Sequence, residues 1–130
     1  MTTKQFDVTI KDEPGEIALV ADALAKSTVN IKGISTEKGE KNATLHIVSE
    51  DADGARKALK VARVKFTERD VFVVPLEYKA GELAKIANRL AEAGVNIETL
   101  FVLGGGQAGP DEVVIGVDRQ EKAAKVLSAA

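Results

Sequence analysis

The stretch "EPGEIALVADALAKSTVNIKGIS", residues 13–35, returns later in the same chain as "KAGELAKIANRLAEAGVNIETLF", residues 79–101. The two segments align without a gap, and nine of the 23 aligned positions are identical. The identities preserve the spacing of the apolar residues and also a polar position, since Asn30 aligns with Asn96. An internal repeat of this kind predicts two copies of one supersecondary unit, so it decides the fold.

Each copy changes its hydrophobic period in the same order. Phe6, Val8 and Ile10 alternate with polar residues, which predicts a strand, and the segment that follows has helical spacing. A second helix is predicted over 51–62, with Asp51 as its cap. The pattern predicts a βαββαβ unit over 1–68 and the same unit without its last strand over 69–130. The expected class is α+β, with two tandem ferredoxin-like copies, antiparallel sheets and helices on one face, joined only by "TERD" (67–70).

Composition excludes several classes of function. The chain of 130 residues has a net charge of −2, so it lacks the basic surplus that nucleic-acid binding requires. No signal-like start or long apolar run is present, which predicts a cytoplasmic protein with no membrane role. The absence of cysteine and the single histidine, His46, argue against thiolate metal sites, serine–histidine triads and bound cofactors. We therefore expect no enzymatic activity.

Three motifs occur in a fixed order in this chain. They are "DEPG" (12–15) at the first strand-to-helix turn, a helix rich in leucine and alanine, and then Val-Asn-Ile. This order resembles the ACT domain, and the whole chain resembles a stand-alone tandem ACT protein. The resemblance implies that paired domains bind a free amino acid or similar small effector between them and regulate a metabolic enzyme. The alternative is a structural or interaction module whose ligand sites have degenerated.

The resemblance also implies where the ligand binds: at the first strand-to-helix turn of one copy and the second strand of the other. One site would comprise Asp12, Glu13, Pro14, Gly15, Glu16 and Ile17, completed by Asn96. Its mate would comprise Lys79, Ala80, Gly81, Glu82 and Leu83, completed by Asn30. The second turn departs from the motif, because Lys79 and Ala80 replace Glu13 and Pro14. The first turn is therefore expected to be the better site.

These residue types suit an amino-acid ligand, although each also has a simpler explanation. The free amides and positive dipole end of a helix start favour a carboxylate. Gly15 and Gly81 either admit the ligand to the backbone or only permit the turn. Asp12 either caps the helix or binds the ligand's ammonium group. Asn30 and Asn96 either bind a zwitterion, since an amide offers both donor and acceptor groups, or satisfy local backbone groups.

The outer faces of the two predicted sheets differ in polarity. Strand alternation places Asp7, Thr9, Lys32 and His46 on this face in the first copy. The second copy is expected to carry Val73, Pro75, Leu100, Val102 and Val114 there. Because a large apolar face rarely remains exposed, we predict that it packs against another subunit and gives at least a homodimer.

Overall fold

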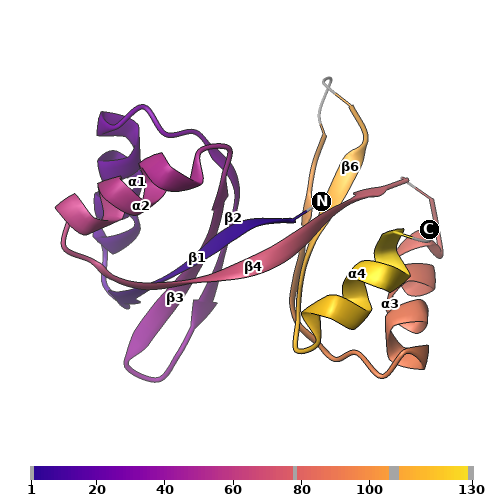
Figure 1. The fold of residues 1–130 in the computed structure, drawn as a ribbon. Helices are drawn as coiled ribbons and strands as arrows, with labels where there is room; N and C mark the ends of the chain where they lie inside the picture. Colours follow the sequence, from indigo (N-terminus) through magenta and orange to yellow (C-terminus); the bar gives the residue numbers. More distant parts are fainter. Residues whose placement is uncertain (1, 78, 106–108, 129–130) are drawn as a thin grey trace. The chain divides into compact units, whose positions relative to one another are not determined.

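The computed structural model describes residues 2–77, 79–105 and 109–128 (Figure 1). Four helices and six strands follow one another as predicted, except that the two strands expected on either side of 67–70 form one strand. They are β1 (Thr2–Lys11), α1 (Glu16–Lys26), β2 (Ile31–Lys38), β3 (Asn42–Ser49), α2 (Ala52–Val61), β4 (Lys65–Leu76), α3 (Glu82–Glu92), β5 (Ile97–Leu103), β6 (Asp111–Val117) and α4 (Gln120–Ser128). The α+β class with two ferredoxin-like copies, the second without a final strand, is confirmed.

The chain forms two compact units, Thr3–Asp70 and Val71–Ala130, and Thr2 is grouped with the second. The first unit has the strand order β2-β3-β1-β4, and the second has β4-β6-β5. The prediction that "TERD" connects two separate strands is wrong, because β4 is one continuous strand of 12 residues through 67–70. This strand is the neighbour of β1, and Lys4 Nζ of β1 lies 2.7 Å from Asp70 Oδ1 at the end of the expected connection.

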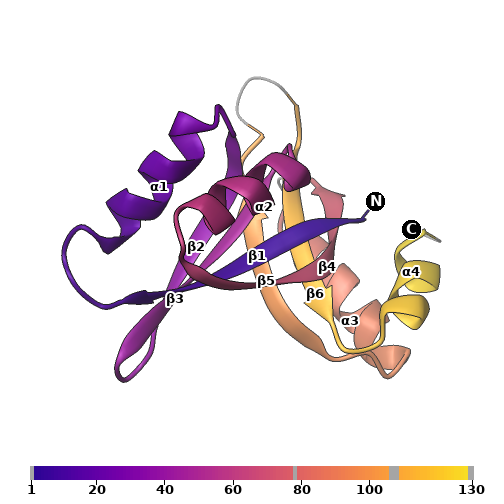
Figure 2. The same cartoon turned by 60° about the vertical axis from the view of Figure 1, so that its left-hand side comes forward.

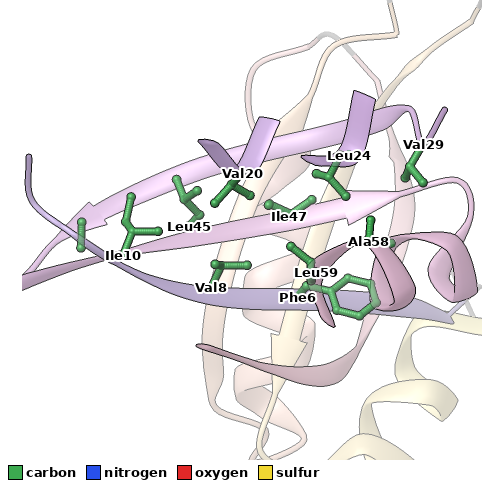
Figure 3. Packing of buried hydrophobic residues seen from close by; sticks show 12 residues of the cluster. Phe6, Val8, Ile10, Val20, Leu24, Val29, Leu45, Ile47, Ala58 and Leu59 are labelled. Atoms are coloured by element: carbon green, nitrogen blue, oxygen red, sulfur yellow. The ribbon is translucent and has the colours of Figure 1, made fainter. Parts of the chain in front are cut away.

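The core of the first unit lies between its strands and one layer of helices (Figure 3). Phe6, Val8 and Ile10 of β1 point toward side chains of α1 and α2. Leu24 and Leu59, from these two helices, are fully buried. Each such side chain stabilises the fold by about 1.5–3 kcal/mol through burial. Figure 2 shows α1 and α2 of this unit from a second direction.

The second unit repeats this arrangement with its own core. Phe72 of β4 and Ile115 of β6 pack with Leu90 of α3 and Ala123 of α4, and all four are buried. One set of alternating residues in β4 and β6, which includes Phe72 and Ile115, therefore faces the helices, as the sequence predicts. No helix of the described residues is long and apolar enough to cross a membrane.

Two β-bulges change which side chains face outward. In β5 the register shifts between Ile97 and Thr99, and after the shift Leu100 packs on the helix-side core. Val102 pairs with the core residue Val113, so it also lies on the helix side. The predicted outward positions of Leu100 and Val102 are therefore wrong, because the extra residue of a bulge reverses the alternation.

The bulge in β2 lies at the equivalent place, between Ile31 and Gly33. Lys32 lies inside this irregularity, and Ser35 stands opposite His46. The prediction that Lys32 lies on the outer face assumed regular strand alternation, which the bulge interrupts at this residue.

The rest of the outer face of the first unit is as predicted. Asp7 and His46 are cross-strand partners, and Asp7 Oδ1 lies 2.7 Å from His46 Nδ1. The buried Gln5 also donates from Nε2 to Asp7 Oδ1 over 2.8 Å. In the second unit, Val73 and Val114 are already buried in the single chain. Their burial needs no second subunit, and a dimer through this face stays a prediction.

The helix ends show how closely the two repeats correspond. After α1, Val29 N donates to Leu24 O over 3.0 Å, and after α3, Val95 N donates to Leu90 O over 2.9 Å. Both ends form a Schellman motif, which requires a left-handed residue just past the helix. The second repeat uses Gly94 with φ 75°, whereas the first uses Thr28 with φ 55°. At the start of α2, Asp51 accepts from Gly54 N over 2.9 Å, so its predicted cap is confirmed.

Candidate functional site

The first strand-to-helix turn is built around a left-handed glycine. Gly15 has φ 91° and is the N-cap of α1, with no side chain capping the helix. The first helical hydrogen bond runs from Leu19 N to Gly15 O over 3.0 Å. The amides of Ile17 and Ala18 therefore begin the helix without a partner in the described part of the chain. Asp12 does not cap this helix, so that alternative is wrong.

The Asp12 carboxylate instead pairs with a lysine of another strand. Its Oδ2 lies 3.3 Å from Lys38 Nζ, and both side chains are exposed. Glu13 and Pro14 are exposed as well, whereas Glu16 is half-buried. Ile17 is 47% exposed, which is unusual for a large apolar residue and leaves it accessible to a ligand.

The second turn has the same backbone geometry and a measurable hollow. Gly81 also has φ 91°, and Lys85 N donates to Gly81 O over 3.0 Å. A hollow of about 470 Å³ lies over this turn. Its lining includes Lys79, Ala80, Gly81, Glu82, Leu83 and Asp111. Five predicted residues of the second site are thus brought together.

The geometry explains why both turns need glycine. A φ of 91° is strained for any residue with a side chain. A Cβ atom built on Gly15 or Gly81 meets no other atom within 4 Å. The backbone conformation therefore accounts for both glycines, and the open space in front of them leaves the turn accessible.

Asn30 and Asn96 occupy equivalent positions, each one residue before a strand. Both are exposed, and neither side chain makes a hydrogen bond within the described residues. Asn96 is held by its backbone instead, since its N–H donates to Asp118 Oδ1 over 2.9 Å. Hydrogen bonding of the side chain to nearby backbone groups therefore does not explain these two asparagines.

With the two turns described, the comparison with known proteins decides the family. A family model described as an ACT domain pair matches residues 1–129. The chain belongs to this family. The resemblance read from the sequence is confirmed over essentially its whole length.

Solved structures share the fold of this ACT pair. Protein BT0572 from Bacteroides thetaiotaomicron superposes with a TM-score of 0.89 at 26% identity, covering 99% of this chain and 88% of that one. The regulatory subunit of aspartate kinase from Thermus thermophilus gives 0.69 at 21%, covering 99% and 92%. The equivalent subunit from Thermus flavus gives 0.64 at 20%, covering 99% and 94%. A search of curated proteins gives no match.

The two ACT turns include side chains that sequence reasoning missed. Lys38 contacts the first turn from the end of β2, and Asp111 lines the second hollow from the start of β6. No local motif marks either residue, because strand pairing brings each of them to the turn. No group of three or more His, Asp or Glu side chains in the described residues is arranged to hold a metal ion.

An arginine of the first ACT repeat holds two carboxylates away from its turn. Arg56 Nε and Nη2 each donate to Glu68 over 2.7 Å, and Nη1 donates to Asp53 over 2.7 Å. The hydrogen bond from Arg56 lowers the pKa of the Glu68 carboxyl, and the bonds to Glu68 and Asp53 raise the pKa of Arg56. This pair links α2 to β4 and has a structural role.

Proposed function

We propose that this ACT pair is a non-catalytic sensor of a free amino acid or a similar small effector, which regulates a partner enzyme or the assembly of the chain itself. The observation that carries the proposal is the glycine turn that starts α1 and α3, with φ 91° in both repeats. The regulatory role of two structural neighbours, by their names, agrees with it.

The first turn offers complementary groups to a zwitterion. The amides of Ile17 and Ala18 and the positive end of the α1 dipole favour a carboxylate, by about 0.3–2 kcal/mol from the dipole alone. Asp12 accepts the ammonium group in this proposal. Its contact with Lys38 Nζ at 3.3 Å supports the assignment, because a lysine head is chemically an ammonium ion.

The length of α1 favours completion of each site by the other repeat. Within one repeat the turn precedes the helix and the asparagine follows it, so 11 helical residues separate the two. A helix of this length spans about 16 Å, which exceeds the reach of an amino acid. We therefore propose Asn96 as the partner of the turn at Asp12, and Asn30 as the partner of the turn at Gly81.

The second turn remains a candidate site in spite of its altered sequence. Its hollow of about 470 Å³ falls within the range of about 300–1,000 Å³ that small-molecule sites usually have. We propose that both turns bind, with the first preferred because Asp12 has no acidic counterpart at Tyr78. A ligand that contacts both repeats regulates through its different affinity for their alternative arrangements.

Calorimetric titration of the amino acid that most stabilises the chain in a thermal-shift screen tests the proposal. Asp12→Asn and Asn96→Ala should each weaken binding about tenfold or more, since the first removes the charge that pairs with the ammonium group and the second removes an amide contact, each worth about 1–3 kcal/mol. The two changes should also be non-additive in a double-mutant cycle. As the matched control, the effects of Asp12→Asn and Asn30→Ala on binding should be additive, because the two residues belong to different proposed sites.

Two outcomes contradict the proposal. Additivity in both cycles would separate Asp12 from Asn96 and refute a site shared between the repeats. No stabilisation by any standard amino acid at millimolar concentration would favour the structural or interaction module with degenerate sites.

A further inference from the structure

The helix surface of the first repeat carries a groove between α1 and α2. Two adjoining hollows of about 420 and 310 Å³ share Leu19 and Ala62 in their linings. We call their union the α1–α2 groove. Its apolar lining also includes Ala23, Ala58 and Val61.

The apolar side chains of the α1–α2 groove are unusually accessible. Val61 is 83% exposed and Leu19 is 49% exposed, so neither belongs to the core below. Removing such surface from water contributes about 25 cal/mol per Å² of apolar area. Both side chains therefore gain free energy when a partner covers them.

The second repeat serves as an internal comparison. Leu19 aligns with Lys85 and Ala23 with Arg89, so the equivalent surface is polar. Arg89 Nη2 also donates to the Val126 carbonyl over 2.9 Å and bridges α3 to α4. The ACT framework thus does not require an apolar groove, and its presence is specific to the first repeat.

Basic side chains outnumber acidic ones along the α1–α2 groove. The two linings contain Lys11, Lys26, Arg63 and Lys65 but only Glu16 and Asp22 as acids. The groove therefore has a surplus of two positive charges, in a chain whose net charge is −2. None of the four cations forms an ion pair with a described residue.

Arg63 is placed beside the groove by the C-terminal end of α2. Its φ is 58°, and it occupies the left-handed position after α2, with its N–H donating to Lys60 O over 3.1 Å. Thr28 holds the same position after α1 with φ 55°, so this conformation belongs to the helix end, and it fixes where Arg63 leaves α2 beside the groove.

From these observations we propose that the α1–α2 groove docks an amphipathic helical segment of a partner protein. The segment presents leucine-like side chains to Leu19 and Val61, and its flanking Asp or Glu residues pair with Lys11, Arg63 and Lys65. This is the helix-in-groove mode of peptide recognition, with charge complementarity fixing orientation.

The groove adjoins the first ligand turn, since Glu16 of the predicted ligand site also lines it. Leu19 N donates to Gly15 O, so Leu19 and the glycine turn belong to the same first turn of α1. The inference goes beyond the proposed ligand binding and does not depend on it, because a peptide probe reports on the groove without any amino acid present.

The test uses the full chain and three fluorescein-labelled peptides of about four helical turns. One has a leucine stripe with glutamate flanks, the second replaces the glutamates by lysines, and the third replaces the leucines by alanines. We expect saturable binding of the first peptide by anisotropy, with NMR shifts of α1 and α2 amides. The other two should bind at least about tenfold more weakly, since each loses one class of contact.

Exposed positions give variants that leave the core unchanged. Val61→Glu should weaken binding of the first peptide about tenfold, because it places a charge against the leucine stripe. Lys65→Glu should weaken this binding several-fold, because it repels the glutamate flanks. The matched control Lys122→Glu, on exposed α4, should leave affinity unchanged within about twofold.

Three results would overturn the inference. The first is the absence of saturable binding, and the second is equal binding of the lysine-flanked peptide. The third is a dependence of the α1 and α2 shifts on protein concentration alone, which would identify a second copy of this chain as the occupant.

Discussion

Thr28 holds a backbone conformation that suits glycine, and replacing it by glycine should stabilise the first repeat. Thr28 has φ 55°, whereas its aligned counterpart Gly94 has φ 75° in the same helix-end motif. A β-branched residue in this region is a clear outlier. The expected gain in folding stability therefore follows from comparing the same position in the two repeats of this chain.

The magnitude combines three terms. Releasing the left-handed strain contributes about 1–2 kcal/mol, and the greater freedom of glycine in the unfolded chain offsets about 0.5–1 kcal/mol of it. Thr28 Oγ1 also donates to the Ser27 carbonyl over 2.7 Å, but this bond is exposed and adds little. We expect Thr28→Gly to raise the free energy of unfolding by about 0.5–1 kcal/mol, and Gly94→Thr to lower it by at least as much.

Urea unfolding, followed by far-UV circular dichroism and by NMR peak intensities of each unit, measures both changes. A gain of about 0.5–1 kcal/mol shifts the midpoint by roughly 0.3–0.7 M for a typical urea dependence. Thr28→Ala is the control, because it removes the branched side chain while keeping a Cβ in the left-handed region. If Thr28→Ala stabilises as much as Thr28→Gly, or if Thr28→Gly destabilises, the left-handed strain is not the cause.

Three further substitutions test the structure. Asp51→Ala should cost about 1 kcal/mol in thermal or urea unfolding through loss of the α2 cap, and Asp51→Asn should restore most of it. Because the pKa of Glu68 is lowered below 4.5 in the folded state, its contribution is present above pH 4.5 and is lost as pH falls further. Glu68→Gln should thus lower the urea midpoint at neutral pH, with the difference shrinking in acid; a pH-independent difference would contradict the ion pair. Leu59→Ala should cost about 2–5 kcal/mol by leaving a cavity in the first core, whereas exposed Val61→Ala should be nearly neutral.

The sequence predicts the parts of this protein that depend on local pattern and on duplication. The offset between Gly15 and Gly81 identifies the two repeats, and both glycines adopt φ 91°. The alternation around Phe6 predicts the buried face of β1, and the placement of Asp51 predicts the α2 cap. The strand face and the cap follow from neighbours within a few positions, where capping and periodicity act directly, whereas the two repeats follow from the duplication itself.

The tertiary structure decides the features that depend on strand pairing. A bulge between Ile97 and Thr99 turns Leu100 toward the helices, because one extra residue reverses every later side chain. Lys38 reaches Asp12 only because β2 ends beside the first turn. A sequence pattern does not predict how close two such distant segments lie in the fold. The repeat could therefore be recognised from the amino-acid sequence alone. The hydrogen-bonded register of the strands decided which side chains face outward from each sheet and which residues contact each turn.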